Sequence, residues 1–491
     1  MLSTYLILFV LTLLGLALLK RHLDAHRKLP PGPLGVPLLG YLPFLNVFDL
    51  GGSFAKLGSK YGDVFSLRTG TKMSVVLNSY EAVKSAFSNP DLLARPDTFM
   101  FRFFSHGQNG LASASGDSWN VQRKFTHKTL RSLGFGSAKM EAHLQDEVSE
   151  LVDLLEAKAE GGKPVEIGYD INVSVVNVIW ALISGERRPH GDLELRSFLT
   201  SVNKGIELAS TSGVLLFMPF LAKLLPEWVF KLDEMKKWMS QSYGFLSKVI
   251  GEHKASFDPE TPRDFIDSFL AESAKPGAHS SFNEFQLQVL CSELFGAGGE
   301  PTSVTLKWAL RFLALYPEVQ AKAAAEIEAA VGNDSRVAFA DRSKLPYVQA
   351  LVHEIVRFSD IHPIGVLHSP SVDTSIDGYA VPEGTFVFPN FHQIHRDPEH
   401  WSHPDVLHPE HWLDAEGRFT GGNRKGFIAF GVGKRKCPGQ EVALMELFVF
   451  VSNLVQKFKF SLPEGAPVDC EKTMGAVVGP KPYDIVLEPR F

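Results

Sequence analysis

The stretch that decides the fold lies near the C-terminus and reads Phe430-Gly431-Val432-Gly433-Lys434-Arg435-Lys436-Cys437-Pro438-Gly439. It holds a single thiol, Cys437, in a glycine-rich loop, and a helical stretch over residues 440–455 follows at once. Glycines let a backbone approach a bound group closely. Loop N–H groups and a helix N-terminus stabilise a thiolate relative to a thiol. The loop therefore favours one sulfur ligand on a large, flat iron cofactor.

Two neighbours of Cys437 suit such a cofactor. Arg435 is placed to pair with an anionic group on the cofactor rim, and Phe430 is placed to shield the sulfur from water. The alternative is that Cys437 is a buried structural thiol, which would not require the spacing Phe-x-x-Gly-x-Arg-x-Cys-x-Gly.

This spacing resembles the haem-ligand loop of the cytochromes P450, the haem-thiolate monooxygenases. The resemblance extends over nearly the whole chain after its apolar N-terminus and is strongest to the animal microsomal two-clan type. It implies haem b, an iron protoporphyrin IX with Cys437 as axial thiolate and Gly439 beside it. It also implies a mostly α fold with a minor β part: a triangular helical domain with small β-sheets and a single N-terminal membrane anchor.

Composition is that of ordinary globular protein with one exception. Of 491 residues, 45% are hydrophobic and 21% are charged, and the net charge of −6 predicts no general attraction to nucleic acid. The three cysteines are too few for a disulfide framework and fit a reducing compartment.

The exception is the N-terminus, where Leu2 to Leu19 form 18 residues without a charge, about the minimum for a membrane-spanning helix. Lys20 and Arg21 follow, so the positive-inside rule places the N-terminus in the lumen and the remainder in the cytosol. A cleaved signal peptide, the alternative, would carry its basic residues first. We expect an anchor over residues 1–20, a basic, proline-rich linker over 21–33 and a catalytic domain over 34–491. The resemblance implies the endoplasmic reticulum membrane, crossed once.

The remaining pattern is mainly helical. Apolar alternation on either side of Gly70 predicts a β-hairpin, and residues 119–316 have helical periodicity in nearly every segment. Ser281-Phe282-Asn283-Glu284 has the form of a capping box, with helical pattern from there to Leu315, roughly 50 Å at 1.5 Å per residue. Pro317 opens a further, alanine-rich helix that Gly332 closes, and short strands follow Arg357.

Three residues are predicted to be structural. Glu354 and Arg357 lie three apart on one helix face, which alone is a weak signal. In the family such a pair forms a buried ionic lock with a residue of a later motif, which here is His411. His392 and His395 have zinc-like spacing, but the segment around them resembles the irregular stretch before the haem loop.

The two haem propionates need donor or cationic partners. Trp119 and Arg123, spaced i,i+4, would present an indole N–H and a guanidinium together, and the resemblance adds Arg435, His368 and Arg95. The alternative for Trp119 and Arg123 is a surface cation–π pair.

The predicted oxygen side departs from the family pattern. Residues 295–302 align with Ala-Gly-x-Asp/Glu-Thr-Thr, but Pro301 occupies the position of the first threonine, whose hydroxyl usually orders a proton-delivering water. Proline cannot donate to the carbonyl four residues back, that of Ala297. We expect an altered proton relay built from Glu300, the Ala297 carbonyl and, if the helix kink turns it inward, Thr302.

The substrate pocket is expected to be apolar and aromatic, which suits a hydrophobic molecule such as a steroid, fatty acid, terpenoid or xenobiotic. About half of the candidates are expected to be core residues instead. The candidates are Phe101, Phe104, Leu111, Phe295, Ala297, Val366 and Val477. The apolar segment from Gly213 to Phe230 is too short to span a bilayer; it fits either a membrane-surface lid or the core.

Electron delivery needs a basic docking face. Its candidates are Lys124, Lys128, Arg131, Lys434 and Lys436, with Arg424 and Lys425 nearby. Such a face would steer an acidic partner, and the resemblance implies NADPH–cytochrome P450 reductase, with cytochrome b5 as a second candidate. The alternative is a merely solvated basic face.

Two rival functions also fit the sequence. Pro301 is compatible with a haem-thiolate isomerase or dehydratase that rearranges a peroxide without a reductase. A non-catalytic haem- or steroid-binding protein at the membrane is the other. The intact cysteine loop and basic face favour the monooxygenase, which inserts one oxygen atom of O2 into an apolar substrate.

Overall fold

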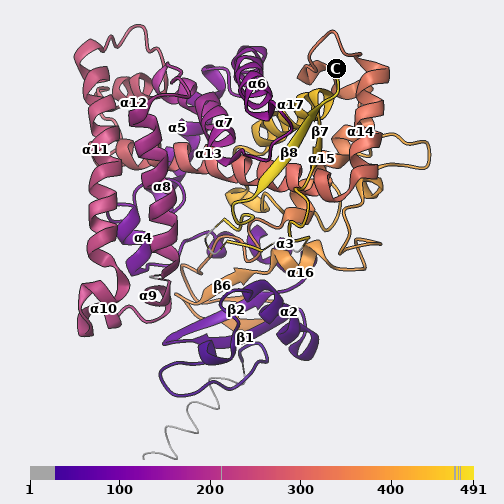
Figure 1. Cartoon of the computed structure of the whole chain (residues 1–491). Helices are drawn as coiled ribbons and strands as arrows, with labels where there is room; N and C mark the ends of the chain where they lie inside the picture. The colour runs from indigo at the N-terminus through magenta and orange to yellow at the C-terminus, as the bar shows by residue number, and fades with distance from the viewer. Residues whose placement is uncertain (1–27, 212, 469–470, 474, 476) are drawn as a thin grey trace, which may run out of the picture. The chain divides into compact units, whose positions relative to one another are not determined.

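The computed structural model describes residues 28–211, 213–468, 471–473, 475 and 477–491 (Figure 1). These residues form two compact units that share the chain in six alternating segments. The first unit holds residues 28–96, 364–393 and 432–434, and the second holds 97–363, 394–431 and 435–491. The sequence predicts one domain over residues 34–491. The structure has two units, but because their segments interleave, no single linker divides them.

The first unit is built on a three-stranded sheet. Strands β1 (Val64–Thr69) and β2 (Lys72–Leu77) pair antiparallel, with Gly70 in the left-handed region at φ 61° between them, so the predicted hairpin is confirmed. Strand β6 (Phe386–Pro389) adds to β2 in parallel, with Ser74 opposite Phe386. The other elements of this unit are η1 (Leu42–Phe44), α2 (Leu50–Tyr61), α3 (Tyr80–Ser88), η2 (Pro90–Leu92), β4 (Thr374–Ile376), β5 (Tyr379–Val381), the start of α16 (Phe391–His395) and the start of η6 (Gly433–Arg435).

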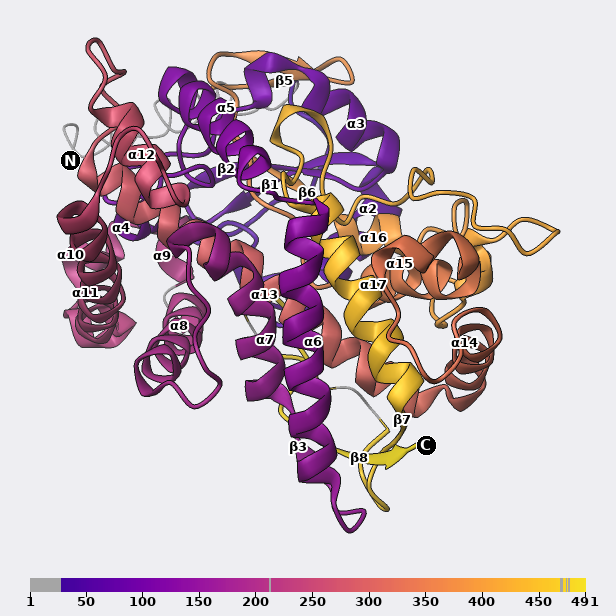
Figure 2. The ribbon, with the colours of Figure 1, turned by 90° about the horizontal axis from the view of Figure 1, so that it is seen from above.

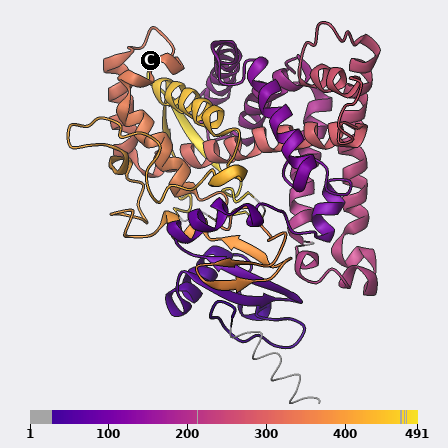
Figure 3. The ribbon, with the colours of Figure 1, turned by 180° about the vertical axis from the view of Figure 1, so that it is seen from behind.

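The second unit is mainly helical, as the periodicity predicts. Helices α6, α7 and α17 lie side by side (Figure 2), and α8 packs along α11 (Figure 3). Its helices are α4 (Phe99–Phe104), α5 (Gly116–Ser132), α6 (Ala138–Ala159), α7 (Gly168–Ser184), α8 (Leu193–Thr211), α9 (Val214–Phe217), α10 (Leu221–Leu224), η3 (Glu227–Phe230), α11 (Leu232–Ser256), α12 (Phe265–Ser273), α13 (Glu284–Leu315), α14 (Pro317–Ala330), η4 (Phe339–Lys344), α15 (Pro346–Ser359), η5 (Pro409–Trp412) and α17 (Gln440–Lys457). A short sheet in the order β3-β8-β7 completes it, from β3 (Val165–Glu166), β7 (Phe458–Ser461) and β8 (Asp484–Pro489).

Helix α13 is the axis of the second unit, since α7, α15 and α17 all pack on it. It ends at Leu315 as predicted, and α14 follows at Pro317, but the expected capping box is wrong. The helix begins at Glu284, and the Asn283 side chain accepts from the N–H of Gln286. An asparagine at this position is as good a cap as serine, so the helix starts two residues later than the Ser281 pattern suggests.

Two glycines let α7 approach α13 closely. A Cβ on Gly299 would lie 2.5 Å from Cγ2 of Val176, and one on Gly298 would lie 2.9 Å from Cγ1 of Ile179. Only residues without a side chain fit this crossing. The glycine-rich run that marks the predicted oxygen side is therefore also a packing requirement.

None of the described helices is both long and apolar enough to cross a membrane. The predicted anchor, residues 1–20, lies outside the described residues.

Candidate functional site

The cysteine loop turns sharply and places Cys437 just before a helix. The N–H of Cys437 donates to the carbonyl of Phe430 at 2.8 Å, and Gly431 and Gly433 have φ of 70° and 71°, which only glycine adopts at little cost. Gly439 is the N-cap of α17, and a Cβ there would lie 3.8 Å from the Cys437 sulfur. The sulfur therefore lies at the N-terminus of a long helix.

The surroundings of the Cys437 sulfur act on its pKa in two opposite directions. Its thiol is accessible to solvent although protein atoms surround most of it. Burial raises the pKa of this thiol, while the Gly439 N–H and the charges of Arg123 and Lys436 act to lower it. A cation bound to the sulfur would complete the stabilisation of the thiolate, as thiolate ligands require.

Hydrogen-bond donors gather beside the cysteine. Trp119 is only 5% exposed, and its Nε1 has no hydrogen-bond partner among the described residues. The Arg435 guanidinium lies 3.8 Å from the Trp119 ring centroid, and Arg123 donates to the carbonyl of Lys436 at 2.5 Å. Because Trp119 is buried under Arg435, the alternative of a surface Trp119–Arg123 pair is wrong.

These donors fit a haem. An unpaired buried N–H is rare and costly. The N–H of Trp119 is such a group, and it lies near the guanidinium groups of Arg123 and Arg435 and the thiol of Cys437. Propionates would supply the missing acceptors and counter-charge, and a thiolate would supply the axial ligand. The donor set therefore matches a cofactor with a metal centre and an anionic rim.

The other two propionate candidates lie together in the first unit. His368 is buried, stacks on Phe87 with a centroid separation of 3.8 Å, and places Nδ1 2.7 Å from the Leu92 carbonyl. Arg95 donates to the carbonyl of Leu367 at 2.7 Å. The backbone bridge between Ala94 and Ser369 holds these two positions in register.

Glu354 is the centre of a fully buried polar cluster. Its carboxylate accepts from Arg357 at 2.9 and 2.6 Å and from Trp412 Nε1 at 3.1 Å. It also meets His411 Nδ1 at 3.1 Å and the backbone N–H of His408 at 3.0 Å. Burial alone would raise the pKa of Glu354, but the hydrogen bonds from Arg357 and His411 lower this pKa to about 2.

Arg357 extends the cluster into the irregular segment before the cysteine loop. It donates to the carbonyls of His395 at 2.7 Å, Pro404 at 2.9 Å and Val406 at 3.2 Å, and lies 5.0 Å from the Trp401 ring. One side chain of α15 thus fixes three points of a segment that lacks regular structure.

The comparisons with known proteins agree with this site. The family model described as cytochrome P450 matches residues 30–487. The chain belongs to the cytochrome P450 family. It is 36% identical over 492 residues to cytochrome P450 2J3 of Rattus norvegicus, covering 99% of this chain and 96% of the relative. It is 34% identical over 479 residues to cytochrome P450 2L1 of Panulirus argus, covering 94% and 95%. The protein is therefore a haem-thiolate monooxygenase with the mostly helical P450 fold and small sheets.

On the predicted oxygen side of this cytochrome P450, the geometry separates the candidate relay residues. Ala297 is exposed on α13, and Glu300 is part-buried. Burial raises the pKa of Glu300 to about 7, although Lys307 acts to lower it. Thr302 is 4% exposed and hydrogen-bonds to Glu446 of α17. Thr302 is therefore a buried residue that interacts with Glu446 in this structure.

Glu446 is a residue that the sequence analysis missed. It is 2% exposed, and burial raises its pKa to about 8, with the Thr302 hydrogen bond acting in the opposite sense. The signal was present: Glu446 is the only charged residue between Glu441 and Lys457, in an otherwise apolar helix face. A carboxyl group at such a position is rarely incidental.

The pocket candidates divide between open and buried positions. Ala297 and Val366 are exposed, and Phe101, Phe104 and Leu111 are part-buried. By contrast, Phe295 is 2% exposed and its ring packs on Trp180 and Phe198, and Val477 belongs to the main hydrophobic core. Phe295 is thus a core residue in this structure.

The basic candidates are exposed, with one exception. Lys124, Lys128, Arg131, Lys434 and Lys436 are all exposed. Within the described part of the chain, only Arg131 among them pairs with an acid, Glu441 at 3.7 Å. Arg424 points inward: it donates to the carbonyls of His411 and His400 and lies 5.0 Å from the Trp401 ring. Arg424 therefore stabilises the lock segment and not a docking face.

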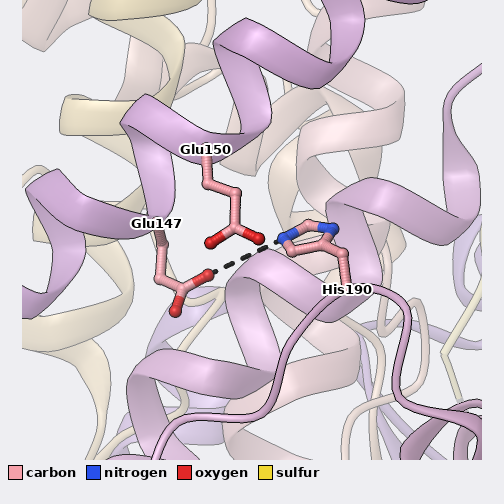
Figure 4. Close-up of side chains that lie close together, drawn as sticks. All are labelled: Glu147, Glu150 and His190. Atoms are coloured by element: carbon pink, nitrogen blue, oxygen red, sulfur yellow. Dashed lines mark ion pairs between the residues drawn. The ribbon is translucent and has the colours of Figure 1, made fainter.

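A cluster of two acids and a histidine in the second unit has the spacing of metal ligands. Glu147 and Glu150 of α6 face His190 of the α7–α8 connection, with Glu147 3.8 Å from His190 (Figure 4). Arg187 already neutralises both acids, at 2.5 Å from Glu147 and 3.0 Å from Glu150. The cluster is an ion-pair network that fastens this connection to α6.

Proposed function

We propose that this cytochrome P450 inserts one oxygen atom of O2 into a small apolar molecule, with electrons passed from NADPH by a flavoprotein reductase. The observation that supports this most is the gathering of Trp119, Arg123 and Arg435 around Cys437. When bound, the haem supplies the activation of oxygen and its transfer. The protein supplies position, protons and exclusion of water.

In this proposal each group has one task. The Cys437 thiolate is the axial ligand, with Phe430 and Gly439 beside it. Trp119 Nε1 and Arg123 bind propionate, together with Arg435, His368 and Arg95. Glu354, Arg357 and His411 hold the segment that leads to the cysteine loop and take no part in the reaction.

The proton supply is assigned to Glu300. A carboxyl group with a pKa near 7 is suited to both take up and release a proton at neutral pH. Because Pro301 carries no hydroxyl, Glu300 and the Ala297 carbonyl would hold the water that a threonine usually orders.

The substitution Pro301→Thr tests this relay. If Glu300 and the Ala297 carbonyl already complete it, product formed per NADPH consumed stays within about twofold of the wild-type ratio, whereas Glu300→Gln lowers it about tenfold or more. The coupling ratio is measured from NADPH oxidation and product yield together. A large gain in coupling from Pro301→Thr would show that the natural relay is incomplete.

The substrate site is assigned to the α4 aromatics, Phe101 and Phe104, with Leu111, Ala297 and Val366. Apolar walls with few polar groups suit a hydrophobic ligand, and a panel of steroids, fatty acids, terpenoids and xenobiotics in difference spectra would narrow the class.

The location is assigned to the endoplasmic reticulum membrane, with residues 1–20 as a single anchor and the remainder in the cytosol. Exposed apolar side chains between α9 and α11 support contact with lipid: Leu224 is 71% and Trp228 is 72% exposed, while Leu215 and Phe230 are buried. The segment over residues 213–230 is thus partly core and partly apolar surface. A glycosylation acceptor fused before Met1 should be glycosylated in microsomes; an unmodified acceptor would refute the lumenal N-terminus.

The central test is spectroscopic. Dithionite-reduced protein under carbon monoxide should show the far-shifted Soret band of sulfur-ligated haem, and Cys437→Ser should abolish it. Turnover that requires NADPH and reductase supports the monooxygenase. Rearrangement of a peroxide without NADPH would instead support the isomerase or dehydratase that Pro301 leaves open.

A further inference from the structure

One histidine joins the end of α11 to the start of α12, which lies beside it (Figure 1). His253 is in the last turn of α11, and Asp264 is the N-cap of α12. The Nε2 atom of His253 lies 2.9 Å from Oδ2 of Asp264, and its Nδ1 atom lies 2.8 Å from the carbonyl oxygen of Val249. Both ring nitrogens therefore have a partner at hydrogen-bond distance. We refer to residues 257–264 as the α11–α12 connection.

Both partners of His253 are acceptors. A carbonyl oxygen and an ionised carboxylate accept hydrogen bonds and cannot donate them. Neutral imidazole has one N–H and one lone pair, so it would direct a lone pair at one of the two oxygens, whereas imidazolium donates to both. A proton on Asp264 is the alternative, but a carboxyl group with an ordinary pKa of about 3.9 releases its proton before an imidazolium of about 6.5. The geometry therefore assigns a positive charge to His253.

The charge balance at the start of α12 favours the same form. Asp264 is 2% exposed and Asp267 is fully buried. Arg263 binds Asp267 with both arms of its guanidinium, at 2.6 and 3.1 Å. Two buried carboxylates and one guanidinium leave one negative charge, and buried charges require a partner. Protonated His253 supplies it.

The pKa of His253 follows from these contacts. Burial alone would lower the pKa, but the hydrogen bonds to Asp264 and Val249 and the charge of Asp267 raise it above the ordinary value of 6.5. Because the pKa is raised in the folded state, the contribution of the cation to stability is complete below pH 6.5. This contribution is lost as pH rises through the pKa of the folded protein.

The titratable groups on the neighbouring elements do not replace this cation. Cys291 of α13 faces Asp264, and burial raises the pKa of its thiol, so it stays neutral. Glu186, which follows α7 and faces Arg263, is exposed. Lys254 is bound to Glu284 of α13 at 3.0 Å. The proton on His253 is therefore the charge that changes near neutral pH.

The α11–α12 connection leads into a helix that supports α5. The rings of Phe265 and Phe269 on α12 pack on Phe125 of α5, with centroid separations of 5.8 and 5.7 Å. We propose that the proton on His253 is a pH-sensitive fastening, which holds the α11–α12 connection and the first turn of α12 while it is bound and loosens them when it is lost. Cys437 and its neighbours take no part in this fastening, so it can fail without affecting the proposed function.

Hydrogen exchange in the full-length holoprotein tests the fastening. Exchange is measured at pH 6.0 and pH 8.5, with labelling times scaled for the intrinsic pH dependence of amide exchange and with EDTA present throughout. The informative amides are those of residues 261–268, which include the N–H of Arg263 and of Asp267, bonded to the carboxylates of Asp267 and Asp264. Protection of these amides in the wild type should be several-fold lower at pH 8.5 than at pH 6.0.

Two variants remove the cation in different ways. His253→Gln removes the titrating ring, and Asp264→Asn removes the counter-charge but keeps a side chain that caps a helix equally well. Protection of residues 261–268 should be equal at the two pH values in both variants. His127→Gln, at an exposed position of α5, makes the same change elsewhere and should retain the wild-type pH dependence.

Three results would overturn the fastening. The first is equal protection at pH 6.0 and pH 8.5 in the wild type. The second is a pH dependence that persists in His253→Gln, because another group would then be responsible. The third is a parallel loss of protection in α6 at pH 8.5, which would indicate unfolding of the whole unit and not a local release.

Discussion

At the scale of single residues, Glu354 shows how a buried charge becomes tolerable. A buried ion pair is by itself weak evidence for stability, because desolvation opposes the Coulomb gain. Here the two carboxylate oxygens meet donors from Arg357, His408, His411 and Trp412, so the charge is hydrogen-bonded on every side. The large effect on the free energy of unfolding is expected when one partner is removed, because the other charge then stays buried without a counter-charge.

We therefore expect Glu354→Gln to lower the free energy of unfolding by about 3–5 kcal/mol, since it leaves the Arg357 charge buried and unpaired. The matched control is Glu272→Gln, which breaks the exposed i,i+3 pair with Lys275 and should cost no more than about 0.5 kcal/mol. Urea unfolding followed by fluorescence measures both. Similar losses in the two variants would show that the lock contributes nothing particular.

The lowered pKa of Glu354 has a defined sign. Because the pKa in the folded state, about 2, lies below the ordinary value of 4.5, the carboxylate stabilises the fold above pH 4.5 and this contribution is lost as pH falls toward 2.

The raised pKa of Glu446 affects the pH dependence of stability in the opposite direction. Its pKa in the folded state, about 8, lies above the ordinary value of 4.5, so folding favours the protonated form and stability falls as pH rises between these values. Glu446→Gln removes this loss. The variant should gain on the wild type by up to roughly 1.4 kcal/mol per pH unit between pH 5 and 7. Unfolding free energies at several pH values measure it, with Glu441→Gln on the exposed face as control. Parallel pH profiles for wild type and Glu446→Gln would contradict the assignment.

At the scale of elements, the crossing of α7 and α13 depends on glycine. Gly299→Ala would place a methyl group 2.5 Å from the buried side chain of Val176. Overpacking costs about 1–3 kcal/mol and exceeds the helix preference for alanine, so we expect a net loss of about 1–2 kcal/mol.

Gly296→Ala is the matched control, because nothing lies within 4 Å of a Cβ there and alanine favours the helix by about 0.5–1 kcal/mol. Thermal unfolding of both variants gives the comparison. Stabilisation by both would mean that α7 can move aside without cost.

Elements with a strong local signal were predictable from sequence. The hairpin around Gly70, the end of α13 at Leu315 and the start of α14 at Pro317 follow from turn, periodicity and proline rules that act within a few residues. The start of α13 was not predictable from sequence. Ser281 and Asn283 are both suitable cap residues, and only the folded backbone selects Asn283.

The candidate site was predictable where a motif fixes the spacing, as around Cys437, and less so where tertiary contacts decide. Thr302 could not be assigned to Glu446, nor Arg435 to the Trp119 ring, because each partner lies more than a hundred residues away. Among the aromatic pocket candidates, Phe295 could not be placed correctly either, because its burial depends on distant parts of the chain. Periodicity cannot distinguish a core residue such as Phe295 from a pocket residue.

At the scale of the whole molecule, a protein with net charge −6 carries an exposed basic group near its cysteine. Lys124 and Lys128 of α5 and Lys436 before Cys437 are exposed and make no ion pair among the described residues. Such a local reversal of sign steers an acidic partner in an ionic-strength-dependent way.

We expect Lys128→Glu to slow reductase-supported turnover about tenfold at low salt, with the deficit shrinking as salt is added, and to leave peroxide-supported turnover unchanged. Lys237→Glu, at an exposed position of α11, makes the same charge change on another helix and should leave both rates near wild type. Equal losses with reductase and with peroxide would refute docking at this face.

The parallel pairing of β2 with β6 carries a consequence for biosynthesis. The strand that completes this sheet is made about 300 residues after the hairpin (Phe386 less Leu77 is 309 positions), which is roughly 15–60 s of ribosomal elongation. Throughout that interval the nascent chain presents an open strand edge, the kind of surface that pairs with other chains when left uncovered. A chaperone that covers this edge during translation is therefore expected to raise the yield of correctly folded enzyme in a foreign host.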